Sequence, residues 1–154
     1  MNPLQDLYQQ VILDHNRSPH NFGALEAATH HGEGHNPLCG DHYHVHVVVE
    51  DDRIADIRFE GDGCAISKAS ASLMTGVLKG LPVAEARDMA ARFRHMITDD
   101  VSAQTDEALG KLRVLAGVRE FPMRVKCAAL AWHTMTAALE GREEIVGSDS
   151  DETG

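Results

Sequence analysis

The sequence predicts an α+β fold, with a small antiparallel sheet of about three strands covered on one face by helices. Apolar and polar residues alternate over residues 41–60, which is the pattern of strands with one buried face. Apolar residues recur at helical spacing in an N-terminal segment and throughout the C-terminal half. A chain of 154 residues, 43% of them hydrophobic, fits one globular domain with a real core.

The chain is predicted to open with a helix that ends near Asn16. Asn2 suits the N-cap and Pro3 the first helical position. Residues 17–40 are rich in Gly, His, Asn and Pro and are predicted to form a loop, with one short strand near residues 28–33. The apolar positions of the helix are Leu4, Leu7, Tyr8, Val11 and Ile12.

An antiparallel hairpin is predicted next, with a tight turn at Asp51 and Asp52. Its expected buried residues are Tyr43, Val45, Val47, Val49, Ala55, Ile57 and Phe59. Its expected exposed residues are His42, His44, His46, Asp56, Arg58 and Glu60. These three histidines belong to a His-rich segment from His30 to His46, and they could bind a metal. The sequence shows nothing nearby to complete such a site, so a solvated sheet face is the preferred interpretation.

The C-terminal half is predicted to be helical. Gly61-Asp62-Gly63 ends the hairpin, and a helix with Cys64 in its first turn follows and stops at Gly80. A second helix follows Pro82, a shorter one carries Leu109 and Leu112, and the last runs from near Pro122 to before Gly141 with Cys127 close to its start.

The charge balance narrows the class of partner. With 14 basic and 24 acidic side chains the formal charge is −10, which disfavours nucleic acid and anionic membranes as partners. The first residues lack the basic and apolar segments of a signal peptide, so we expect a cytoplasmic protein. A metal, a small molecule or another protein is the expected partner.

Three cysteines, Cys39, Cys64 and Cys127, lie where loops join regular elements. Helix N-termini favour the thiolate, which is both the nucleophile and the metal-binding form. Asp41 offers a carboxylate two residues from Cys39. Pattern alone leaves open whether these cysteines fill the core, act as nucleophiles or share one metal site.

Three segments resemble the cysteine motifs of the IscU or NifU N-terminal-like family, which acts in iron-sulfur cluster assembly. They are Asn36-Pro37-Leu38-Cys39-Gly40-Asp41, then Phe59-Glu60-Gly61-Asp62-Gly63-Cys64-Ala65-Ile66-Ser67, then Arg124-Val125-Lys126-Cys127-Ala128. The resemblance supports one domain over residues 1–141. Residues 142–154 carry one arginine and five acidic residues and are predicted to be a disordered tail.

Two features resemble the SufU branch of this family: Lys126 precedes the third cysteine, where the cluster scaffold usually has histidine, and the stretch between Cys64 and Cys127 is long. The resemblance implies Zn²⁺ held by Cys39, Asp41, Cys64 and Cys127. It also implies a zinc-dependent sulfur acceptor, a sulfurtransferase-like protein that takes persulfide sulfur from a SufS-like cysteine desulfurase onto Cys39. Downstream scaffold or acceptor proteins would receive the sulfur or cluster, and Arg124 and Lys126 are candidate supporting cations.

Two further functions are compatible with the same residues. The same three cysteines could carry a [2Fe-2S] cluster, which would make the protein a scaffold with iron in place of zinc. Alternatively, the zinc could be structural and the chain without sulfur chemistry. Both Zn²⁺ and iron accept sulfur ligands, so the residue types alone do not choose between them.

Overall fold

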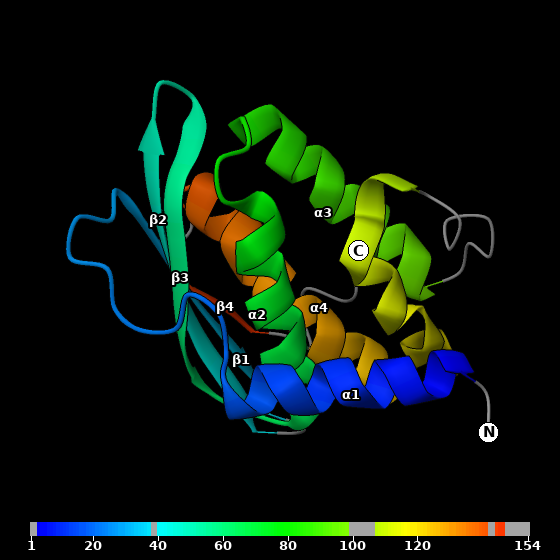
Figure 1. Ribbon diagram of the computed structural model, residues 1–154. Coiled ribbons are helices and arrows are strands. Elements are labelled where there is room, and N and C mark those ends of the chain that lie inside the picture. Colours follow the sequence, from blue (N-terminus) through cyan, green and yellow to red (C-terminus); the bar gives the residue numbers. More distant parts are fainter. Residues whose placement is uncertain (1–2, 38–39, 99–106, 142–143, 147–154) are drawn as a thin grey trace.

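The computed structural model describes residues 3–37, 40–98, 107–141 and 144–146 and confirms the α+β prediction. The helices lie together on one face of the sheet (Figure 1). The elements in chain order are α1 (Pro3–Arg17), β1 (His30–Asn36), β2 (Asp41–Glu50), β3 (Arg53–Asp62), α2 (Ala65–Leu78), α3 (Val83–Thr98), the 3₁₀ segment η2 (Glu107–Glu120), α4 (Pro122–Leu139) and β4 (Glu144–Val146).

The sheet has the strand order β3-β2-β1-β4, and β1, β2 and β3 pair antiparallel. Asp51 and Asp52, at the tip of the β2–β3 hairpin, both have positive φ values, 53° and 61°. A turn with two such residues matches the twist of the flanking strands, which confirms the predicted tight connection. One expectation in β3 is wrong, because Ala55 is exposed and Ile54 is buried in its place. A register shift between Val48 and Val49 inserts an extra residue opposite them and reverses the alternation there.

The C-terminal residues contain a strand that the sequence prediction assigned to a disordered tail. Glu144–Val146 pairs parallel with β1 over Glu33–His35. Two β-branched residues, Ile145 and Val146, suit a strand, but a run of two within an acidic segment is too short to predict one. The other residues of 142–154 lie outside the described part of the chain.

The segment before α4 is also longer than the predicted short helix. It is mainly 3₁₀ and bends at Gly110, whose φ is 49°. Its buried residues recur every three positions, which is the period of a 3₁₀ helix and not the 3.6-residue period of an α-helix. They are Leu109, Leu112, Leu115 and Val118.

Helix α4 is the central element of the helical layer. Its residues are buried on most sides. Two glycines of β1 let α4 approach the sheet closely, since a Cβ on Gly32 would lie 2.6 Å from the Thr134 carbonyl oxygen, and one on Gly34 would overlap the Thr134 hydroxyl. The carboxyl end of β1, and the start of β2 beside it, therefore lie directly beneath the helices.

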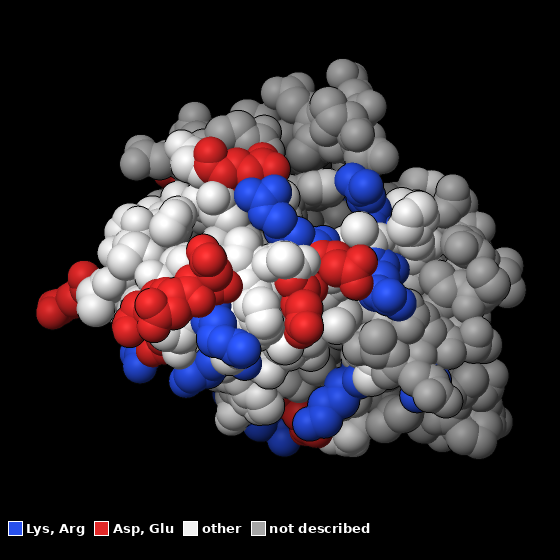
Figure 2. Space-filling model, turned by 90° about the horizontal axis from the view of Figure 1, so that it is seen from above, with Lys and Arg blue, Asp and Glu red and all other residues white. Residues whose placement is uncertain are grey.

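Charged side chains on the described surface pair locally. Lys79 lies 3.3 Å from Asp56, and Arg92 lies 2.7 Å from Asp88. On the face seen in Figure 2, red and blue side chains intermingle over the coloured area, which shows no broad basic zone. Among the described helices, none combines the length and apolar character needed to cross a membrane.

Candidate metal centre

Asp41, Cys64 and Cys127 meet beneath the helices, although they are far apart in the sequence. Asp41 begins β2, Cys64 is the N-cap of α2, and Cys127 lies in the second turn of α4. One ligand atom from each, a carboxylate oxygen and two sulfurs, lies within 4.8 Å of the others. Cys39, the fourth predicted ligand, lies outside the described residues.

The Asp41 carboxylate is completely buried. Its Oδ1 accepts a hydrogen bond from the backbone N–H of Cys64 at 2.8 Å, and its Oδ2 lies 3.9 Å from the Cys64 sulfur. A buried carboxylate is costly unless hydrogen bonds or a positive charge compensate it. The Cys64 N–H supplies one such bond and ties the start of β2 to the start of α2.

Cys64 caps α2 with its own sulfur. The backbone N–H of Ser67 donates to Sγ at 3.4 Å, in the geometry of an N-cap interaction. The hydrogen bond with Cys127 lowers the pKa of Cys64, burial opposes this, and the Ser67 N–H lowers the pKa further, for a net value of about 6. A lowered pKa favours the thiolate, the form that metals and electrophilic sulfur both require.

Cys127 is held in place by a link between α2 and α4. The Ser70 hydroxyl donates to the carbonyl of Ala128 at 2.6 Å and accepts from Trp132 Nε1 at 3.1 Å. Ser70 is completely buried, and Cys127 itself is only 4% exposed. Because Ala128 follows Cys127 directly, this link fixes the second cysteine against the helix that carries the first.

Gly63 leaves the space in which these groups meet. A Cβ at this position would lie 2.5 Å from Asp41 Oδ1, 2.6 Å from the Tyr43 hydroxyl and 2.7 Å from the Ser67 hydroxyl. Tyr43 and Ser67 also bond to each other at 2.9 Å. The sequence pattern predicts Tyr43 only as a core residue and does not single out Ser67. The available signal was the spacing from Cys64 to Ser67, which is that of an N-cap and its N3 residue.

The donor set fits a metal that accepts both sulfur and oxygen. Around tetrahedral Zn²⁺, bond lengths of about 2.0–2.3 Å place neighbouring ligand atoms roughly 3.3–3.8 Å apart. A cluster within 4.8 Å reaches that spacing with small side-chain movements. Two thiolates beside a fully buried carboxylate also need a positive charge among them.

The predicted supporting residues, Arg124 and Lys126, precede Cys127 on α4. The Arg124 guanidinium lies 4.4 Å from the centre of the Phe121 ring, and both residues are exposed. Lys126 is half-buried on α4. Their role as supporting cations stays a prediction.

The histidines of β2 face away from the centre, as predicted. His42 and His44 alternate with the buried Asp41 and Tyr43, so they stand on the sheet face opposite the helices. The expectation that nothing nearby could complete a metal site with them is wrong. Glu33 of β1 pairs with His44 across the strands and lies beside both rings. The sequence did not show this, because the register between β1 and β2 was unknown.

Comparison with known proteins identifies the family. Residues 7–141 match the model of the NifU-like N terminal domain. The chain is 38% identical, over 91% of its length and 87% of the relative, to the "iron-sulfur cluster assembly scaffold protein IscU" of Streptococcus pyogenes serotype M1. It is 37% identical, over 91% of its length and 94% of the relative, to the "zinc-dependent sulfurtransferase SufU" of Bacillus subtilis.

A solved structure agrees with the sequence relatives. A candidate iron-sulfur cluster assembly scaffold protein for the SUF system of Fervidobacterium islandicum superposes with a TM-score of 0.74 and 34% identity, covering 84% of this chain and 94% of that one. The family model spans most of the chain, and the shared region includes every described residue of the centre. The chain therefore belongs to the NifU-like N-terminal domain family, with SufU and IscU proteins among its relatives.

Proposed function

We propose that this protein acts in iron-sulfur cluster assembly as a zinc-dependent sulfur acceptor for a cysteine desulfurase. The observation that carries the proposal is the convergence of Asp41, Cys64 and Cys127. The similarity to a zinc-dependent sulfurtransferase over 91% of the chain supports it.

The zinc ligands in this proposal are Asp41, Cys64, Cys127 and Cys39. Two residues of chain span at most about 7 Å, and only Gly40 separates Cys39 from Asp41. The flanks of the Cys39 loop are tied together, since Asn36 pairs with Asp41 and the Gly40 N–H donates to the Asn36 carbonyl at 2.9 Å. When bound, zinc would keep the cysteines deprotonated at neutral pH.

Cys39 is the proposed acceptor, because its place in the chain is between the end of β1 and the start of β2, whereas Cys64 caps α2 and Cys127 lies within α4. Its thiolate would attack the terminal sulfur of the desulfurase persulfide. A bond forms between Cys39 Sγ and that sulfur, the sulfur–sulfur bond of the donor breaks, and the desulfurase cysteine leaves as a thiolate. The step exchanges one sulfur–sulfur bond for another and needs no external oxidant.

The test measures sulfide release from cysteine by a purified cysteine desulfurase, with a thiol reductant, in the presence and absence of the zinc-loaded protein. We expect stimulation by the wild type, none by Cys39→Ser, and wild-type stimulation by the exposed-surface control His95→Ala. Mass spectrometry should find one added sulfur atom on Cys39 when the reductant is left out. Full stimulation by Cys39→Ser would rule out the acceptor role.

A scaffold function is the second candidate, because the Streptococcus pyogenes relative carries that name at 38% identity. It predicts that anaerobic reconstitution with iron and sulfide gives a [2Fe-2S] cluster with sulfur-to-iron charge-transfer absorption, lost in Cys127→Ser. Lys126 stands where the sequence resemblance places histidine in the scaffold branch, and this favours sulfur transfer. A purely structural zinc site would instead predict that Cys39→Ala lowers stability and leaves sulfide release unchanged.

A further inference from the structure

The sheet face that points away from the helices carries nine polar side chains, which we call the outer histidine face. The strand registers place them in a three-by-three array without an apolar member. The three rows across β1, β2 and β3 are His35-His42-Asp62, Glu33-His44-Glu60 and His31-His46-Arg58. Imidazole and carboxylate groups are common ligands of divalent transition metals, and eight of the nine side chains are of these two kinds.

Part of this face is already joined by hydrogen bonds. His46 Nε2 lies 2.8 Å from Glu60 Oε1, and His46 Nδ1 lies 2.9 Å from His31 Nδ1. A neutral His46 that donates to the carboxylate through Nε2 accepts from His31 through Nδ1. These three residues form a chain in which both nitrogens of the central ring are used.

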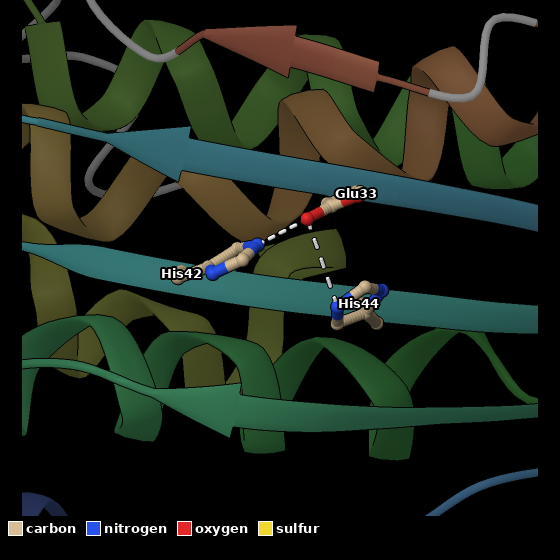
Figure 3. Close-up of side chains that lie close together, drawn as sticks. All are labelled: Glu33, His42 and His44. Carbon is tan, nitrogen blue, oxygen red and sulfur yellow. Dashed lines mark hydrogen bonds and ion pairs between the residues drawn. The ribbon is translucent and has the colours of Figure 1, made fainter.

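A second group on the same face converges on one point. Figure 3 shows His42 and His44 of β2 directed toward the carboxylate of Glu33 on β1. His42 Nε2 contacts Glu33 Oε2, and His44 Nε2 lies 3.8 Å from that same oxygen. The three ligand atoms all lie within 4.8 Å of one another. The cause is the register, since Glu33 is directly opposite His44 and His42 is the next residue along β2 on that face.

We propose that Glu33, His42 and His44 form a second metal site, which binds one divalent transition-metal ion of the Zn²⁺, Co²⁺ or Ni²⁺ type. Two imidazole nitrogens and one carboxylate oxygen suit these borderline cations better than Mg²⁺ or Ca²⁺, which prefer oxygen alone, or Cu⁺, which prefers sulfur. Solvent completes the coordination, because the side chains of His42 and His44 are 47% and 42% exposed.

The site is separate from the cysteine centre, although both use β2. Asp41 and His42 are consecutive, and their side chains point to opposite faces of the sheet. The Asp41 carboxylate is buried against α2, whereas the His42 ring is open to solvent. One ion can therefore occupy each face without sharing a ligand.

A plain hydrogen bond between His42 and Glu33 is the alternative explanation of the contact. It involves two of the three residues and leaves out His44, which the strand register places beside the same oxygen. An exposed pair of this kind also contributes little to stability. Metal binding is the property that separates the two explanations.

The experiment titrates Zn²⁺ into full-length protein whose cysteine centre is already loaded with one zinc, followed by calorimetry. We expect a second equivalent to bind to the wild type. Removing one ligand, in Glu33→Gln or His42→Ala, should weaken this second step at least about tenfold, and His42→Ala/His44→Ala should abolish it. His95→Ala, an exposed histidine on α3, is the matched control and should bind as the wild type does.

Co²⁺ added to the same zinc-loaded protein gives an independent readout. Bound at the outer site it should show d–d absorption without the sulfur-to-cobalt charge-transfer bands that thiolate ligands produce. The substituted residues are exposed or half-buried on the surface, so the variants should keep the first zinc, which metal analysis can verify. No second binding step up to about 1 mM Zn²⁺, or a step unchanged in the double variant, would overturn the proposal.

Discussion

The two faces of β2 carry two ligand sets that are built in opposite ways. Asp41, Cys64 and Cys127 come from three elements remote in sequence, and they meet only because α2 and α4 pack on the sheet. Glu33 and His44 need nothing more than two neighbouring strands in the correct register. Asp41 and Cys127 of the inner set are buried and the set is supported by further hydrogen bonds, whereas no residue of the outer set is buried. The fold and the inner set should therefore depend strongly on each other, and the outer set should be nearly independent of stability.

The largest difference should follow from removal of a ligand on each face. Cys127→Ser is expected to lose the inner zinc and to lower the melting temperature. Zinc at 1,000 times its dissociation constant stabilises the folded state by about 4 kcal/mol. For a chain of this size each kcal/mol corresponds to about 2–4 °C, so we expect a fall of roughly 10 °C. Scanning calorimetry and zinc analysis provide the measurement.

The outer-face control for that experiment is His44→Ala. Its side chain is 42% exposed, so the expected change in the free energy of unfolding is within about 0.5 kcal/mol. The comparison breaks down if both variants lose the same stability, or if Cys127→Ser keeps its zinc.

The next effect concerns the space around Asp41. Gly63→Ala should weaken zinc binding and destabilise the fold, because the new methyl group would meet Asp41, Tyr43 and Ser67 at 2.5–2.7 Å. Overpacking of this kind costs about 1–3 kcal/mol. Zinc competition with a coloured chelator and urea unfolding together measure both effects.

Gly76→Ala is the matched control for Gly63→Ala. Gly76 lies exposed within α2, and a Cβ there meets no atom within 4 Å. Alanine is favoured over glycine in a helix by about 1 kcal/mol, so this variant should be as stable as the wild type or more so. Equal zinc affinity in both variants would show that Gly63 does not shape the centre.

The link that positions Cys127 should have a smaller effect. Ser70→Ala removes the donor to the Ala128 carbonyl and leaves the Trp132 indole N–H without its acceptor. A buried polar group that loses its partner costs about 1–3 kcal/mol. Urea unfolding of Ser70→Ala against the exposed control Ser18→Ala measures this cost, and a faster loss of zinc to a chelator would show that α4 holds Cys127 less firmly.

The sequence predicts the parts of the molecule that local rules determine. The Asp51-Asp52 turn, the helix that begins at Pro122 and the outward direction of the histidines of β2 follow from turn chemistry, capping and alternation. The expected exposure is found for His42, whereas the His46 side chain is only 12% exposed. The convergence of Asp41, Cys64 and Cys127 needs long-range packing, and only a resemblance to a family indicated it. The part of the fold that local rules missed depends on tertiary context, since β4 exists because the edge of β1 is available to pair with it.

The two ligand sets differ in how far they could be predicted from the sequence. Cysteines at helix starts are visible in the sequence, so the inner residues could be named before the structure. Glu33 could not be named in this way, because its proximity to His42 and His44 depends on the register between β1 and β2. The sequence alone does not determine that register. A one-residue slip would place Glu33 on the buried face.

His15 is buried, in contrast to the outward-facing histidines of β2, and its protonation should affect stability. Ser72 Oγ accepts from the backbone N–H of His20 at 2.7 Å, so its own proton is free to donate to His15 Nδ1, 2.6 Å away. Protonation of His15 would remove that acceptor. Burial lowers the pKa of His15 below 6.5, and the neighbouring His20 lowers it further. The folded state therefore binds the proton less readily than the unfolded chain does.

The sign of the pH dependence follows from this difference. As the pH falls through 6.5, His15 becomes protonated in the unfolded chain but stays largely neutral in the folded protein. The free energy of unfolding therefore decreases. His15→Gln keeps a hydrogen-bond acceptor but does not titrate, and it should show a shallower decline between pH 7.5 and 5.5 than the wild type. Urea unfolding of zinc-loaded proteins at both pH values measures this, and because both proteins carry the same cysteine centre, its own pH dependence cancels from the difference. The exposed control His95→Gln should decline as the wild type does, and an identical decline in His15→Gln would mean that His15 is protonated equally in both states.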